Sequence, residues 1–119
     1  MVGIGRLGAR IEPRFRAAVF QVGGLLPVRR LPEADPFHFL RHVKMPVLMV
    51  NGEFDEYFPL ETAQRPMWRL LGTPPEMKSL VVYPAGHMAP FPRDQVMNDV
   101  LGWFDRYLGP LGSAAAPGK

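Results

Sequence analysis

The sequence predicts an α/β domain built on a parallel sheet of about three strands. Two continuous apolar runs, residues 46–51 and 79–83, have the composition of strands buried on both faces, and each ends in a small turn and one ionisable residue. Amphipathic helical patterns follow them, at 60–71 and 93–108. Strands that alternate with helices pair in parallel through right-handed crossovers, and 119 residues leave room for one such domain.

The first part of the chain is predicted to hold one helix end, one short strand and a long loop. Residues 6–16 have the pattern of a helix end that Pro13 breaks, because proline cannot continue a helix interior. The apolar run at 17–22 is expected to be a short buried strand that stops at Gly23-Gly24. A proline-rich loop follows it.

Two helical segments flank the first strong strand. At 36–43 we expect one or two helical turns, since Asp35 is a good N-cap and Pro36 suits the first helical position. The segment 60–71 contains Pro66, so its helix is expected to start after that residue or to kink there. One face of this segment carries an apolar stripe, formed by Leu60, Ala63, Met67, Leu70 and Leu71.

The clearest predicted helix spans 93–108 and ends at Gly109-Pro110. Trp103 on this helix, like Trp68 on the preceding one, is expected to belong to the core. We assign residues 1–110 to the domain and 111–119 to a flexible tail. The helix stripe expected to face the sheet comprises Val96, Met97, Val100, Leu101, Phe104 and Leu108.

The two ionisable residues after the strong strands, Asp55 and His87, are the candidate site. Carboxyl ends of parallel strands meet at one edge of a sheet, so the two side chains are expected to lie side by side. An imidazole can take a hydroxyl proton and return it to a leaving group, and a carboxylate can fix its tautomer. A turn aspartate that bonds its own backbone and an exposed loop histidine are the plainer interpretations, and Glu53 and Glu56 are lesser candidates for the acid.

Two motifs together resemble the α/β-hydrolases, in particular the esterase, dienelactone-hydrolase and prolyl-oligopeptidase-like branch. The segment from Gly52 to Pro59 is similar to the family's acid turn, and Gly86-His87 after a strand is similar to its histidine turn. The resemblance covers roughly residues 6–110 but only the last half of the family's fold. It implies that Asp55 and His87 serve a serine that attacks an ester or amide carbonyl through an acyl-enzyme.

The chain departs from the family at the nucleophile, which the family carries in a G-x-S-x-G turn upstream of the matching segment. Of the two serines, Ser79 begins a strand, at the wrong end of the sheet, and Ser113 lies in the tail. We therefore expect the C-terminal segment of a serine hydrolase, without the nucleophile-bearing half and inactive alone, and leave open whether this chain is an enzyme. The alternative is a non-catalytic interaction or accessory module that retains the half-fold.

No cofactor or metal is expected. His38 and His42 would share a helix face near Asp35, but a closed zinc site needs four ligands and no others are evident. Phe37 and Phe39, with Trp68, could line an acyl pocket if the proline-rich loop covers the site.

The net charge of +3 comes largely from arginines in the first thirty residues, and we favour a solvated surface over nucleic-acid binding because no aromatic residues alternate with them. No apolar run approaches the length of a membrane helix. The absence of cysteine fits a cytoplasmic protein and excludes disulfides and cysteine nucleophiles. The sheet edge next to 17–22 would stay unpaired, so we expect a homodimer or a partner chain there.

Overall fold

The computed structural model describes residues 14–28, 30–88 and 91–110. The part of the predicted first helix before residue 14 and the tail 111–119 lie outside these residues. Three strands and several short helical turns precede one long helix. In chain order the elements are β1 (Ala18–Gln21), α2 (Pro36–Phe39), the 3₁₀ turn Leu40–His42, β2 (Val47–Gly52), the π turn Leu60–Gln64, α3 (Arg65–Leu70), the 3₁₀ turn Pro75–Met77, β3 (Lys78–Tyr83) and α4 (Arg93–Leu108).

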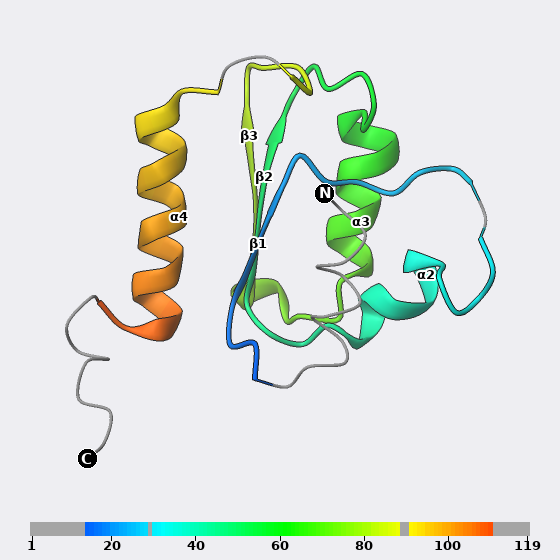
Figure 1. Ribbon diagram of the computed structural model, residues 1–119, viewed down its shortest axis with the longest axis horizontal. Coiled ribbons are helices and arrows are strands. Elements are labelled where there is room, and N and C mark those ends of the chain that lie inside the picture. Colours follow the sequence, from blue (N-terminus) through cyan, green and yellow to red (C-terminus); the bar gives the residue numbers. More distant parts are fainter. Residues whose placement is uncertain (1–13, 29, 89–90, 111–119) are drawn as a thin grey trace.

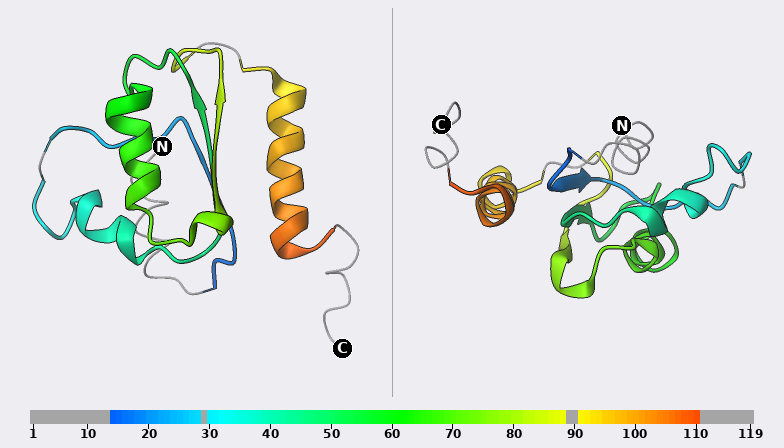
Figure 2. Two further views of the ribbon diagram at one scale, coloured as in Figure 1. Left: turned by 180° about the vertical axis from the view of Figure 1, so that it is seen from behind. Right: turned by 90° about the horizontal axis from the view of Figure 1, so that it is seen from below.

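The described strands form one parallel sheet in the order β1-β2-β3, as predicted. α3 covers one face and α4 the other, so the molecule has three layers (Figures 1 and 2). Every residue of the central strand β2 is buried, which explains its unbroken apolar sequence. The carboxyl ends of all three strands point to the same edge, at the top of Figure 1.

The helical turns before β2 and before β3 follow the local sequence. Asp35 caps α2 by accepting a hydrogen bond from the backbone N–H of Phe37 at 3.1 Å, and Pro36 takes the first position. Pro66 is the second residue of α3, where its missing N–H costs little. α3 begins at Arg65, one residue before Pro66, so the helix does not start after the proline. A wider π turn at Leu60–Gln64 runs directly into it.

α4 has the predicted bounds, but the stripe that faces the sheet differs from the predicted one. Val96 is buried, and Val100 and Trp103 pack with it against the sheet. Met97, Leu101 and Leu108, predicted to be buried, are 50%, 47% and 41% exposed. The apolar residues of α4 occupy two adjacent stripes, and the described three-stranded sheet covers one of them.

Two apolar clusters hold the layers together. Between the sheet and α3 lies a cluster formed by Leu25, Leu40, Val43, Val47, Met49, Met67 and Leu71, with Trp68 packed against it. Between the sheet and α4 lies a cluster formed by Leu48, Val50, Tyr83 and Val96, with Trp103 packed against it. Both tryptophans are therefore part of the packing, as the sequence predicts.

Candidate functional site

The turn that follows β2 lies directly against the turn that follows β3. The backbone N–H of Glu53 donates to the carbonyl of Tyr83 at 2.8 Å, and that of Phe54 donates to the carbonyl of Ala85 at 3.0 Å. A methyl group on Gly52 would overlap the Ala85 carbonyl oxygen. Position 52 therefore requires glycine because the two turns approach so closely.

Asp55 shapes its own turn with one carboxylate oxygen. Oδ1 accepts the backbone N–H groups of Tyr57 at 2.9 Å and Phe58 at 2.8 Å. This is the local bonding expected of a turn aspartate. It leaves the other oxygen, Oδ2, free to bind a different group.

That group is His87. Its Nδ1 lies 2.9 Å from Asp55 Oδ2, in an interaction between a side chain that is 19% exposed and a carboxylate that is fully buried. Because a carboxylate accepts, we place the proton of the neutral ring on Nδ1, which leaves the Nε2 lone pair unused. The structure thus brings together the two predicted site residues at the carboxyl edge of the sheet.

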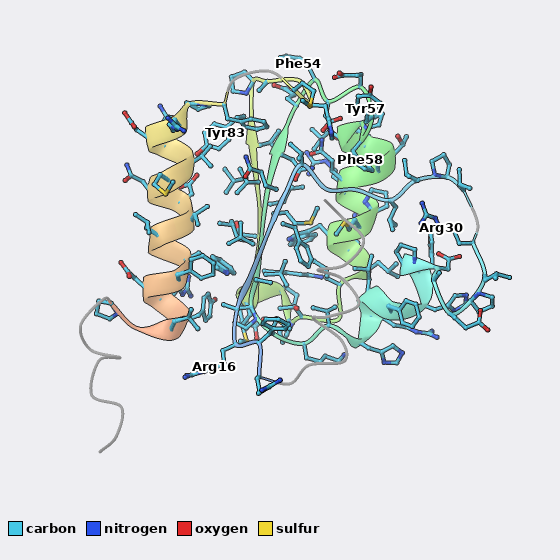
Figure 3. The ribbon with its side chains drawn as sticks, in the orientation of Figure 1. Arg16, Arg30, Phe54, Tyr57, Phe58 and Tyr83 are labelled. Carbon is cyan, nitrogen blue, oxygen red and sulfur yellow. The ribbon has the colours of Figure 1, made fainter. Side chains whose placement is uncertain are left out.

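Two aromatic side chains of the same turn hold the imidazole from the sides. The ring centroid of Tyr57 lies 4.8 Å from that of His87 in an edge-on contact, and the centroid of Phe58 lies at 5.7 Å. Phe58 is buried, whereas Tyr57 and the nearby Phe54 are exposed at this edge (Figure 3). Among the described residues, the imidazole therefore has one polar partner, Asp55, and aromatic neighbours that limit its rotation.

The two glutamates considered as alternative acids do not contact the imidazole. Glu56 Oε2 instead accepts the backbone N–H of His87 at 3.2 Å. The pKa of Glu56 is lowered, first by a hydrogen bond with its own backbone and then by the one from His87. Glu53 is exposed, and its carboxylate forms no hydrogen bond or ion pair with the described residues.

Tyr83, the last residue of β3, links the histidine turn to α4. Its hydroxyl donates to the Asp99 carboxylate, and its ring lies between the sheet and α4 (Figure 3). Burial, together with the hydrogen bond to Asp99 and the negative charge of that carboxylate, raises the pKa of Tyr83 to about 12. This contact fixes the strand from which the His87 turn departs.

Three supports of the site were not predicted. Gln64 is buried, and its Nε2 donates to the carbonyls of Gly52 and Phe58, both at 2.7 Å, so that it ties the start of the acid turn to its end. Asn51 Nδ2 donates to the Gly23 carbonyl at 2.6 Å and so joins the ends of β2 and β1. Val22, the residue directly after β1, has a positive φ of 49°, which is rare for a β-branched residue.

The sequence contains a feature that points to each of the two polar supports, Gln64 and Asn51. Gln64 lies four residues after Leu60, three before Met67 and seven before Leu71, which places it on the buried stripe of its helix. Asn51 is a polar residue at the end of an otherwise apolar strand. No feature of the sequence indicates the positive φ of Val22.

Other candidate residues lie away from this edge. Ser79 is the second residue of β3, about 13 Å of strand before its carboxyl end, and Ser113 lies outside the described residues. The loop and α2 that carry Phe37 and Phe39 lie beside α3 and do not cover the edge (Figures 1 and 2). Within the described ranges, which include His38 and His42, no group of three or more histidine, aspartate or glutamate residues could hold a metal ion.

Two of the basic residues from the first thirty positions lie on different parts of the fold. Arg16 lies at the amino end of β1, whereas Arg30 lies on the loop beside α3 (Figure 3). Arg6 and Arg10 belong to the part of the chain that is not described. None of the helices within the described ranges has the length and apolarity that a membrane crossing requires.

The fold is similar to that of a known esterase. Three solved structures of a cold-adapted esterase from an Arctic intertidal metagenomic library match it: a zinc-bound form with a TM-score of 0.70 at 21% identity, a polyethylene-glycol complex with 0.67 at 20%, and a native form with 0.67 at 21%. The matches cover 87%, 87% and 84% of this chain but 44%, 41% and 42% of the esterase chain. The chain thus spans less than half of the protein it matches. No protein-family model matches it, and no curated protein has a similar sequence.

Proposed function

We propose that this chain supplies the acid and the base of a serine hydrolase that cleaves carboxylic esters. The observation that carries the proposal is the Asp55–His87 pair, 2.9 Å apart at the carboxyl edge of a parallel sheet. The likeness in fold to an esterase supports ester over amide bonds as the substrate. Asp55 and His87 are the proposed catalytic residues, with no metal or cofactor.

In this proposal His87 moves the protons. Nε2 takes the proton of a serine hydroxyl while the oxygen attacks the ester carbonyl, and the resulting imidazolium returns it to the leaving alcohol. A water molecule then replaces the alcohol, and Nε2 takes one of its protons as the water oxygen attacks the acyl carbonyl. The imidazolium gives that proton to the serine oxygen as the bond between this oxygen and the acyl carbon breaks and the carboxylic acid leaves. Asp55 stays ionised throughout, holds Nδ1–H and stabilises the imidazolium.

We assign the serine to a segment outside this sequence. Ser79 is at the opposite end of β3, and none of the serine or threonine hydroxyls in the described ranges is hydrogen-bonded to His87. Without a nucleophile and oxyanion-hole donors, this chain would hydrolyse esters slowly at most. The chain as given would then form one part of the active site.

The surface that would receive this segment is the free edge of β1 together with the exposed stripe of α4. β1 pairs with β2 on one side only, among the described strands. Met97, Leu101 and Leu108 form an apolar surface that the described sheet does not cover. A strand paired with β1 and followed by a helix would bring a nucleophile to the edge that holds His87. A second copy of the chain is the other occupant we consider.

The alternative function is a non-catalytic accessory module that keeps the half-fold and docks through the same surface. The described residues alone do not complete a catalytic site, because Ser79 lies at the opposite end of β3 from His87. This observation agrees with the accessory module as well as with the hydrolase. We also propose a cytoplasmic location, based on the absence of cysteine.

The test begins with the coding sequence next to this chain, where the enzyme proposal requires a G-x-S-x-G segment between a strand and a helix. That segment and this chain would be produced together and assayed with p-nitrophenyl acetate. We expect His87→Ala and Asp55→Asn to lower the rate by about 10⁴-fold, whereas Ser79→Ala leaves it unchanged. Absence of such a segment, or activity that does not depend on His87, would favour the accessory module.

A further inference from the structure

The backbone of His87 is held separately from its ring. Asp55, Tyr57 and Phe58 contact the imidazole, and each of these contacts restrains the ring alone. The backbone N–H of His87 donates to Glu56 Oε2 at 3.2 Å. Asp55 and Glu56, adjacent in the chain, therefore each bind a different N–H group of the same residue.

The contact with Glu56 matters because few bonds fix this part of the histidine turn. Ala85 is anchored by the bond from Phe54, but His87 is two residues further along, after Gly86. An ionised carboxylate makes a stronger hydrogen bond to an N–H group than a neutral acceptor does. The Glu56 carboxylate is ionised at neutral pH, and the hydrogen bond with its own backbone and the bond from the His87 N–H both help to lower its pKa.

We infer that Glu56 is a positioning residue, which holds the His87 backbone so that the imidazole reaches Asp55 and presents Nε2 at the edge of the sheet. The consequence for catalysis rests on the proposed function, but the positioning itself does not. Glu56 does not touch the reacting atoms in this arrangement and acts only through His87.

The variants Glu56→Ala and Glu56→Gln test this inference in the chain itself, with Glu53→Ala as the matched control. Glu53 belongs to the same turn and is exposed, and its carboxylate has no partner among the described residues. NMR would measure two quantities in each variant: the exchange rate of the His87 backbone amide, and the imidazole Nδ1–H resonance at neutral pH. The free energy of unfolding would be measured alongside.

We expect Glu56→Ala to speed up exchange of the His87 amide about fivefold, the factor lost with one hydrogen bond, and to broaden the Nδ1–H resonance. The amide oxygen of Glu56→Gln can still accept but carries no charge, so the exchange rate of this variant should fall between those of the wild type and Glu56→Ala. Glu53→Ala should change neither quantity.

Unchanged amide exchange and an unchanged Nδ1–H resonance in Glu56→Ala would overturn the inference. So would an equal effect in Glu53→Ala, because that would indicate a general effect of charge on the turn. These readouts need no nucleophile and no substrate. If the esterase proposal failed, the two NMR readouts would therefore still test the positioning role. If the positioning role failed, the activity could still depend on His87.

Discussion

The close approach of the acid turn and the histidine turn makes Gly52→Ala the sharpest perturbation of the site. The added methyl group would overlap the Ala85 carbonyl oxygen and lie 2.9 Å from the Gly86 carbonyl oxygen, where ordinary contacts begin at 3.4 Å. Both of these atoms belong to the backbone, so no side-chain rotation can relieve the overlap. The two turns must move apart.

The expected cost follows from two contributions. Forcing an extra methyl group into a packed region costs about 1–3 kcal/mol. Separating the turns also weakens the bonds from Glu53 and Phe54 to the histidine turn, each with a net value of about 1 kcal/mol. We therefore expect Gly52→Ala to lower the free energy of unfolding by about 3–5 kcal/mol, a large part of the stability of a small domain.

Urea unfolding followed by circular dichroism and tryptophan fluorescence would measure this change. The control is the same substitution at Gly102, which lies on α4 with no atom within 4 Å of the added methyl group. Gly102→Ala should stabilise the chain by about 0.5–1 kcal/mol through helix propensity. A decrease in the free energy of unfolding of less than about 1 kcal/mol in Gly52→Ala would contradict the close contact between the two turns.

Two further predictions concern residues that support the site. Gln64→Met keeps the side-chain length but removes the N–H donors that bind the carbonyls of Gly52 and Phe58. We expect this variant to lower the free energy of unfolding, measured at equilibrium, by about 2–4 kcal/mol. A decrease below about 0.5 kcal/mol would argue against this bridge. The pKa of Tyr83 is about 12 in the folded chain and about 10 in the unfolded chain. The hydroxyl of Tyr83 therefore contributes fully to stability below pH about 10, and this contribution is lost as the pH rises through about 12. The difference in unfolding free energy between the wild type and Tyr83→Phe should accordingly be constant up to pH about 10 and shrink above it; a difference that stayed constant to pH 12 would contradict the shift.

The sequence predicts the strands and the long helix well because their patterns are local. The apolar run of β2 and the period of α4 are complete within their own segments, and Gly109 marks the end of α4. The pairing of Asp55 with His87 also follows from the sequence, since parallel strands place their carboxyl ends together. The topology of the sheet alone brings these two residues together, whatever the packing of the side chains.

The errors and omissions arise where tertiary contacts decide. The apolar residues of α4 form one continuous arc that is wider than the face the sheet covers, so its periodicity alone does not decide whether Met97 or Trp103 faces the sheet. The role of Gln64 is not predicted from the sequence, because it depends on the carbonyl groups that the side chain binds, and these are known only from the structure. The same holds for the bond between the His87 backbone and Glu56, which joins two turns 31 residues apart.

The proposed function depends on a buried carboxylate that holds the imidazole of His87 in one tautomer, with Nε2 free to take a proton. Long-range ¹H–¹⁵N NMR of the imidazole, at a pH where the ring is neutral, measures this directly in the wild type and in Asp55→Asn. We predict that the wild-type proton resides on Nδ1 and that Asp55→Asn shifts the tautomer towards Nε2–H. A wild-type ring protonated mainly on Nε2, or a tautomer ratio that Asp55→Asn does not change, would contradict the account.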